Sequence, residues 1–326
     1  MDLQLPISIT PLPYPMRYGQ KLLLVGSCFT GHIGGALEQW KFDVLQNPNG
    51  ILFDPASVAS SLQSYIEPER YGPEDLFFAN DVWQSWKYHG TFSGTDRETV
   101  LEGIRASQGR AHVFLKQADW LIITLGSSFS YRLKEGGMAV ANCHRMPQQV
   151  FDKHLMTIEE TVSALDGCLH RLFYFNPKIR VLFTVSPVRH IRDGVVENNR
   201  SKARLIESVH HLVSKYERLW YFPAYELVID VLRDYRFFDI DMVHPNYAAT
   251  QFVLEKFTEA CIDPESRRLL EEVRQLVVAR RHRPRHPSTA AHARFLQEHY
   301  EKAAGLARRY PFLRLEEELL YFSAGI

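Results

Sequence analysis

The feature that most constrains the fold is a series of short, continuously apolar runs, the clearest of which end at a glycine or at Ser-Pro. The clear runs lie at residues 21–25, 120–125 and 179–185, and two further strands are predicted at 42–45 and 220–227. Runs of this length are typical of parallel strands that are buried on both faces. Segments with helical spacing separate them, which predicts βαβ units. We therefore expect an α/β fold, a three-layer α/β/α sandwich with a mainly parallel five-stranded sheet.

The segments between these runs complete the predicted core. Helices are expected at residues 31–40, 55–66, 97–117, 152–174, 198–217 and 246–261. Residues 67–95 form an insertion rich in aromatic side chains, and residues 127–150 are predicted to be mostly loop.

The sequence changes character after residue 262. Two further helices are predicted at 267–278 and 289–309, on either side of a basic, proline-broken hinge at 279–287. We therefore predict an α/β domain at 1–262 and a C-terminal helical extension at 263–326. The hinge could meet an anionic partner, but a solvated linker is favoured because the rest of the chain supplies no matching positive surface.

Charge and cysteine content narrow the classes of partner. The 326 residues include 38 Lys and Arg and 38 Asp and Glu, which gives a formal net charge of +0. Such a chain lacks the overall field that holds nucleic acid or an acidic membrane. The start of the chain has no signal-peptide pattern, and no apolar window approaches the roughly 18 residues of a membrane span. We expect a cytoplasmic protein with a small-molecule partner.

The four cysteines are Cys28, Cys143, Cys168 and Cys261, and no two of them have a paired spacing. The pattern argues for neither a disulfide framework nor a zinc site. No cofactor and no metal are expected.

Ser27 is the first candidate for chemistry. It lies in Gly26-Ser27-Cys28-Phe29, where the first buried strand turns toward a helix. Backbone N–H groups at a helix start can stabilise an oxyanion beside such a serine. Ser27 could instead only cap the helix, and the tetrapeptide alone favours capping. Cys28 is a weaker candidate nucleophile, because its side chain is expected to point into the core.

Asp241 and His244 are the second candidate element, within Asp241-Met242-Val243-His244-Pro245. A hydroxyl nucleophile needs a base, and the base needs an acceptor that fixes its tautomer. An Asp and a His three residues apart on a tight loop can form that pair, and a surface loop with an ordinary helix cap is the alternative. Whether the pair meets Ser27 depends on the sheet.

Six motifs in order make the chain resemble the GSCFA family, which is placed within the SGNH/GDSL hydrolase-like superfamily. The resemblance covers about residues 20–260, with Thr30 where the family name implies alanine. Its motifs are Gly26-Ser27-Cys28-Phe29, Asn47-Pro48-Asn49-Gly50-Ile51-Leu52, Thr124-Leu125-Gly126, Asn142-Cys143-His144, Ser186-Pro187-Val188-Arg189-His190 and Asp241-Met242-Val243-His244-Pro245.

This resemblance implies an SGNH hydrolase or flavodoxin-like fold and assigns roles to individual residues. The serine nucleophile falls on Ser27, and the closing Asp-x-x-His falls on Asp241 and His244. The glycine N–H of the oxyanion hole is best matched by Gly50.

The resemblance is weaker at the third sequence motif of SGNH enzymes, which we call the third block. The asparagine donor of that motif is missing after Gly126, where the chain has Ser127 and Ser128. Asn142 is the substitute candidate for the oxyanion hole, with Ser127 behind it.

Four further residues are candidates for substrate binding: His89, Trp86, Arg189 and His144. His89 and Trp86 belong to the aromatic insertion, and His89 could equally be a hydrogen-bonded histidine under an aromatic cluster. Arg189 could hold a carboxylate or phosphate of the substrate, or it could pair with Asp193.

The sequence thus favours a serine-dependent esterase or O-acyltransferase that forms an acyl-enzyme on a small acylated substrate. The aromatic insertion favours a carbohydrate ester. A non-catalytic carbohydrate- or ligand-binding module on a degenerate hydrolase fold is the main alternative. A metal-dependent hydrolase using His89, His144, Asp241 and His244 is a third and weaker reading.

Overall fold

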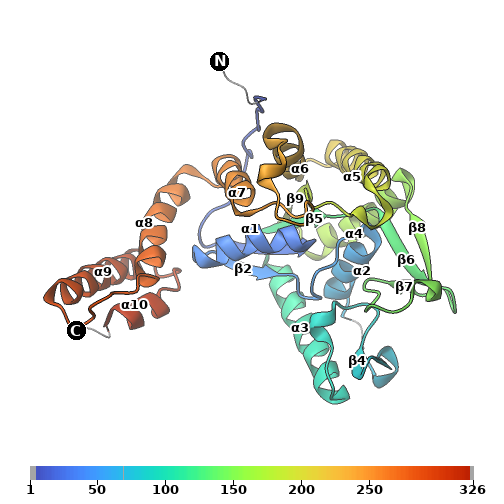
Figure 1. The fold of residues 1–326 in the computed structure, drawn as a ribbon, viewed down its shortest axis with the longest axis horizontal. Helices are drawn as coiled ribbons and strands as arrows, with labels where there is room; N and C mark the ends of the chain where they lie inside the picture. Colours follow the sequence, from blue (N-terminus) through green and yellow to red (C-terminus); the bar gives the residue numbers. More distant parts are fainter. Residues whose placement is uncertain (1–4, 69, 324–326) are drawn as a thin grey trace.

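The computed structural model describes residues 5–68 and 70–323 and contains the expected five-stranded sheet (Figure 1). The strands lie in the order β10-β9-β5-β1-β2, and all neighbouring pairs are parallel. Their bounds are β1 (Lys21–Gly26), β2 (Asp43–Gln46), β5 (Trp120–Leu125), β9 (Arg180–Val185) and β10 (Leu219–Tyr221). Counted in chain order this is a 2-1-3-4-5 sheet, so the predicted α/β fold class is confirmed.

Alternate side chains of the strands pack into two separate hydrophobic cores, one on each face of the sheet. Leu22 and Leu24 of β1 pack in one core, and Leu23 and Val25 pack in the other. The first core lies under α1 (Cys28–Gln39), α7 (Tyr247–Cys261) and α8 (Pro264–Arg280). The second lies under α2 (Pro55–Ile66), α3 (Arg97–Gln117), α4 (Ile158–Phe175) and α5 (Val195–Lys215). Burial on both faces explains why these strands are continuously apolar.

The segment after β5 differs from the prediction of a loop followed by a helix from residue 152. It forms an antiparallel sheet in the order β7-β6-β8, made of β6 (Phe129–Leu133), β7 (Ala139–Val140) and β8 (Phe151–Leu155). Helix α4 begins only after Thr157, which forms a capping box with Glu160. Pairing with β6 therefore overrides the helical spacing that the sequence suggests near residue 152.

The fifth strand is also shorter than the predicted 220–227. β10 ends at Tyr221, and Pro223 is followed by the helical turn α6 (Ala224–Glu226) and a π-helix at Leu227–Leu232. Proline has no N–H for a strand ladder, so the chain leaves the sheet there. Single 3-10 turns lie at Pro73–Asp75, Gly90–Phe92, Gln148–Val150, Ile191–Asp193 and Tyr235–Phe237.

The aromatic insertion contains the hairpin β3 (Phe77–Ala79) and β4 (Val82–Gln84). Asn80 and Asp81 connect the strands with φ angles of 52° and 62°. Two successive residues with positive φ are typical of a tight hairpin turn.

The C-terminal helices extend to one side of the α/β core (Figure 1). They are α8, α9 (Ala290–Arg309) and α10 (Glu316–Ser323), of which α10 was not predicted. Glu318 is fully buried and lies 2.9 Å from Lys41, and Arg314 lies 3.3 Å from Asp43. These ion pairs dock the helices at the amino-terminal end of β2. The domain boundary at residue 262 stays a prediction.

Across the described ranges, the helices are all too short or too polar to traverse a lipid bilayer.

Candidate active site

Ser27 lies at the carboxyl end of β1, where the strand order reverses between β1 and β5. Sheets of this order bind ligands outside the carboxyl ends of the strands at that reversal. Gly26 makes the turn with a φ of 138°, and its N–H donates to Asn47 Oδ1 at 2.9 Å. The Ser27 hydroxyl then caps α1 by accepting from Phe29 N–H at 3.3 Å, and only 2% of the residue is exposed. The capping role that the sequence left open is therefore present.

Asp241 and His244 form the hydrogen-bonded pair that their spacing predicts. Asp241 Oδ2 lies 2.6 Å from His244 Nδ1, and Asp241 Oδ1 accepts from the N–H groups of Val243 and His244 at 2.9 and 3.0 Å. Met242 bends the loop with a φ of 58°. The hydrogen bonds, led by the His244 N–H, lower the pKa of Asp241 to about 2. The carboxylate is therefore ionised at neutral pH and can orient the imidazole.

The loop that carries this pair is tied to the carboxyl end of β9. Arg189 N–H donates to the Val243 carbonyl at 3.2 Å, and its guanidinium donates to the Met242 carbonyl at 3.3 Å. Asp193, the alternative partner expected from the sequence, pairs with Lys153 instead. Arg189 thus positions the loop that carries Asp241 and His244, and contact with a substrate stays a prediction.

Ser27 and His244 reach the same edge of the sheet without a direct hydrogen bond. The Ser27 hydroxyl bonds to Phe29 N–H, and the His244 ring bonds to Asp241. His32 lies five residues beyond Ser27 on α1, and its pKa is lowered by burial and then by the charge of His244. His244 therefore lies near the helix that Ser27 caps, and the approach of His244 to Ser27 stays a prediction.

His190 borders the same small space as Ser27. A Cβ added to Gly126 would lie 3.2 Å from His190 Nε2 and 3.2 Å from Ser27 Cβ. Burial, followed by the charges of Lys202 and His244, lowers the pKa of His190 to about 4. The imidazole is therefore neutral at pH 7. In the sequence His190 was part of the Ser186–His190 motif and had no assigned role.

Two backbone donors expected for an oxyanion hole already have partners. The Ser27 N–H donates to the Thr124 carbonyl at 3.0 Å, and the Gly50 N–H donates to the Asn47 carbonyl at 2.7 Å. An oxyanion could use the Gly50 N–H only if this turn opened.

The two side chains that could replace the missing asparagine donor, Ser127 and Asn142, have different hydrogen-bond partners. Ser127 Oγ lies 3.1 Å from Ser201 Oγ, so it belongs to an internal network. Asn142 is half-buried, and its Oδ1 accepts from His144 N–H at 2.9 Å. The role of Asn142 in the oxyanion hole stays a prediction.

Helix α5 contributes two buried polar side chains that sequence reasoning missed. Lys202 is fully buried, and its Nζ donates to the Gly126 and Ser186 carbonyls, both at 2.6 Å. Asn198 Oδ1 accepts from His190 N–H at 2.8 Å. These bonds clamp the loops that follow β5 and β9.

A signal for this network was present in the sequence. Asn198 and Lys202 share a helical face with Leu205, Val209 and Leu212, all of which are buried. A lysine on an otherwise apolar helical face indicates a buried polar contact. Burial lowers the pKa of Lys202 to about 7.

His89 packs directly on the turn after β2. A Cβ on Gly50 would lie 2.2 Å from His89 Cβ, and His89 N–H donates to the Asn49 carbonyl at 2.9 Å. The positive φ of Gly50, 78°, is a second reason for glycine there. The insertion is therefore fixed at the same sheet edge as Ser27.

Trp86 and His144 lie within the aromatic cluster of the insertion. Trp86 stacks on Phe77 with ring centroids 3.8 Å apart. His144 is buried, and its Nε2 lies 2.8 Å from the Ser85 carbonyl. Their substrate contacts stay predictions.

The four residues of the metal hypothesis are His89, His144, Asp241 and His244. In the described part of the chain, no group of three or more His, Cys, Asp or Glu side chains is placed to hold a metal ion.

Comparison with known families identifies the chain. The model of the GSCFA family matches residues 21–257. The chain belongs to the GSCFA family. A second family model, the C-terminal domain of GSCFA domain proteins, matches residues 273–326. No curated protein sequence matched this GSCFA protein.

Several solved carbohydrate esterases resemble the GSCFA fold at low similarity. The acetyl xylan esterase Est2A from Butyrivibrio proteoclasticus is 12% identical with a TM-score of 0.39, over 74% of this chain and 63% of that chain. A carbohydrate esterase family 3 protein from Talaromyces cellulolyticus is 10% identical with a TM-score of 0.38, over 78% and 99%. A mutant of Axe2, an acetyl-xylooligosaccharide esterase from Geobacillus, is 11% identical with a TM-score of 0.40, over 76% and 96%. This chain spans less than two thirds of Est2A.

A cavity of about 420 Å³ lies between α1, α7 and α8. Phe29, His32 and Tyr247 are among its lining residues. Ser27, Asp241 and His244 do not line it.

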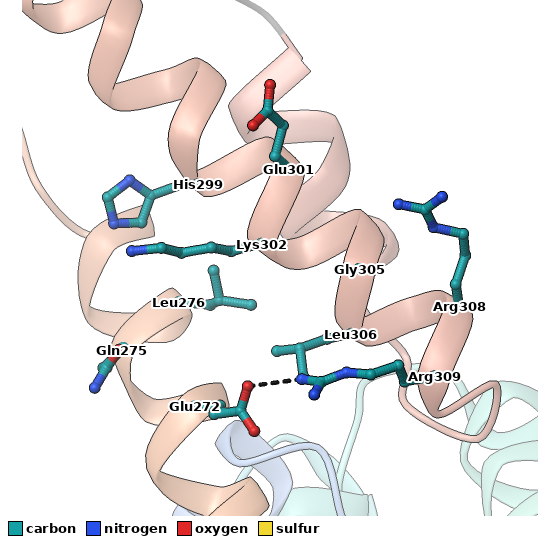
Figure 2. Close-up of a pocket in the computed structure, with 10 residues that line it drawn as sticks. All are labelled: Glu272, Gln275, Leu276, His299, Glu301, Lys302, Gly305, Leu306, Arg308 and Arg309. Atoms are coloured by element: carbon teal, nitrogen blue, oxygen red, sulfur yellow. Dashed lines mark hydrogen bonds and ion pairs between the residues drawn. The ribbon is translucent and has the colours of Figure 1, made fainter.

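A second cavity of about 630 Å³ lies between α8 and α9 (Figure 2). Glu272 and Arg309 form an ion pair at 2.7 Å across it, with Lys302 and His299 nearby. None of the predicted catalytic residues lines this cavity.

Proposed function

We propose that this GSCFA protein is a serine-dependent esterase or O-acyltransferase, with Ser27 as nucleophile, His244 as base and Asp241 as the residue that orients His244. The observation that carries the proposal is the Asp241–His244 hydrogen bond of 2.6 Å, on a loop tied to the sheet edge that holds Ser27. An ionised carboxylate on one imidazole nitrogen leaves the other nitrogen free to accept a proton.

The proposed reaction proceeds through an acyl-enzyme. His244 Nε2 takes the Ser27 proton while Ser27 Oγ bonds to the ester carbonyl carbon, and the carbonyl electron pair moves to oxygen. When the tetrahedral intermediate collapses, the C–O bond to the leaving alcohol breaks and that oxygen receives the proton from His244. Water or a second hydroxyl then attacks the acyl-enzyme by the same route and releases Ser27. Asn142 is a proposed donor to the oxyanion.

Because Ser27 has no direct bond to His244, its side chain must turn from the helix cap toward the base before attack. A serine cap contributes about 1 kcal/mol, and a rotamer change of this size is accessible on the timescale of turnover. Catalytic hydrogen bonds often tighten only when substrate is bound.

We further propose a carbohydrate ester as the substrate class. The aromatic insertion is fixed at the sheet edge by the contact of His89 with Gly50, and Phe78 on β3 is 55% exposed. An exposed aromatic ring in this insertion suits stacking on a sugar ring.

The test is hydrolysis of short p-nitrophenyl esters by two variants. Ser27→Ala removes both the nucleophile and the helix cap, whereas Ser27→Gly removes the nucleophile at a cost of only a few tenths of a kcal/mol in capping. We expect both variants to lose activity while Ser27→Gly keeps wild-type stability. Ser214→Ala, on an exposed position of α5, is the matched control. Turnover by Ser27→Gly at the wild-type rate would refute the assignment.

The alternative function is a binding module without catalysis. The burial of Ser27 and the prior engagement of its N–H and hydroxyl favour this reading. It predicts that a fluorophosphonate probe leaves the wild-type protein unlabelled while an acetylated oligosaccharide binds saturably.

A further inference from the structure

One imidazole nitrogen at the edge of the candidate site is buried without a partner. His190 Nε2 forms no hydrogen bond within residues 5–68 and 70–323. An unpaired buried polar atom costs about 1–3 kcal/mol, so native proteins keep few of them. A catalytic role can explain such an atom, because the atom then forms its hydrogen bond only when substrate is bound.

The position of this nitrogen is fixed from several sides. Asn198 holds the His190 N–H at 2.8 Å, and the His190 ring lies against the Phe53 ring with centroids 4.9 Å apart. Gly126 leaves the space between His190 Nε2 and Ser27 Cβ free of a side chain. The substrate carbonyl that Ser27 attacks would have to enter beside this space.

Three of the candidate donors to an oxyanion already have other hydrogen-bond partners. The N–H groups of Ser27 and Gly50 bond to backbone carbonyls, and Ser127 Oγ bonds within the network of α5. His190 Nε2 is a donor-capable atom at the site that no other group uses.

We propose that His190 is an oxyanion-hole residue whose neutral imidazole donates its Nε2–H to the carbonyl oxygen as Ser27 attacks. The inference rests on the proposed esterase function. The Nε2–H proton stays on His190 throughout, because the proton of Ser27 goes to His244 and is then donated to the leaving alcohol. His190 therefore contributes one hydrogen bond, which strengthens as negative charge develops on the oxygen.

The electrostatics of the site agree with this role. Burial and the neighbouring Lys202 hold the pKa of His190 at about 4, so the ring does not compete with His244 for the serine proton at neutral pH. A neutral histidine with a lowered pKa can polarise a substrate carbonyl. Lys202 also clamps the Gly126 carbonyl, which keeps the space between His190 and Ser27 constant.

The test compares three variants with p-nitrophenyl acetate as substrate. His190→Leu removes the donor, and we expect a loss of about 10²–10³-fold in kcat with little change in KM. His190→Gln keeps an N–H donor at a similar reach, so it should recover a large part of that loss. His211→Leu, which changes an exposed histidine on α5, should behave as wild type. The acid limb of the pH–rate profile, which reports the base, should keep its midpoint in His190→Leu.

A fluorophosphonate probe separates the two proposals. Labelling of Ser27 in the wild type with an unchanged kcat in His190→Leu overturns the role of His190 and leaves the esterase proposal standing. Absence of labelling and of turnover in the wild type overturns both. A loss of the acid limb in His190→Leu would make His190 the base and overturn its role as a donor.

A measurement on the wild type covers the case in which His190→Leu fails to fold. In protein with ¹⁵N-labelled histidine, phosphonylation of Ser27 places an oxygen where the oxyanion would form. We expect the His190 Nε2–H proton to become slow in exchange and to shift downfield. An unchanged His190 signal in the labelled protein would overturn the proposal.

Discussion

Gly126 offers the sharpest test of the geometry at the candidate site. The change is Gly126→Ala, which adds one methyl group between three neighbours. That Cβ would lie 2.9 Å from Phe53 Cβ and 3.2 Å from both His190 Nε2 and Ser27 Cβ. Carbon atoms in contact prefer about 3.5–4.0 Å, so the neighbours must move by several tenths of an ångström or more.

The backbone of Gly126 has little freedom to absorb this movement. Its N–H donates to the Phe53 carbonyl at 2.8 Å, and its carbonyl accepts from Lys202 at 2.6 Å. We therefore expect the strain to fall on Ser27 and His190. Overpacking of this kind costs about 1–3 kcal/mol of unfolding free energy. Displacement of reacting groups by about 1 Å can cost 10²-fold in rate.

The assay pairs urea unfolding with ester hydrolysis, and it has a matched control. Gly167→Ala makes the same change inside α4, where a Cβ would meet no atom within 4 Å. Relief of the glycine penalty in a helix should stabilise that variant by about 0.5–1 kcal/mol. Its activity should equal that of wild type. Wild-type stability and wild-type kcat/KM in Gly126→Ala would refute the packing described around Ser27.

Two further predictions concern ionisable groups. The pKa of Lys202 falls to about 7 in the folded protein from 10.5 when unfolded, so between these pH values the unfolded chain binds more protons and stability rises with pH. Above pH 7, the free energy of unfolding of the wild type, measured with urea, should rise by up to about 1.4 kcal/mol per pH unit relative to that of Lys202→Met. If the unfolding free energies of the two proteins changed in parallel with pH, this would contradict the burial of a titrating lysine. Asp241→Asn should lower kcat by about 10²–10⁴-fold through loss of the oriented His244 tautomer. Because the pKa of Asp241 lies near 2, titration of Asp241 should cause no change in the wild-type rate above about pH 3. A fall in rate near pH 4 that is absent in Asp241→Asn would contradict this.

Local patterns were sufficient for much of the fold. The apolar runs at 21–25 and 120–125 became β1 and β5, and the helices predicted at 55–66 and 97–117 have the same bounds as α2 and α3. Burial on both faces of a strand, and on one face of a helix, leaves a periodic signature that a single sequence carries. The prediction for residues 127–155 was wrong because it used local periodicity alone, whereas β6 and β8 form through pairing with each other.

The spacing of Asp241 and His244 also predicted their hydrogen bond, since three residues on one tight loop fix the geometry locally. What the sequence alone determined therefore lies within short stretches: the strand runs, the helix faces and this pair. The tertiary structure decided the rest of the site. Lys202 reaches the Gly126 carbonyl across 76 residues of chain, and His190 meets the space beside Ser27 only because β9 and β1 both flank β5. Contacts between distant segments depend on strand order and packing, and these leave no periodic signal around any one residue.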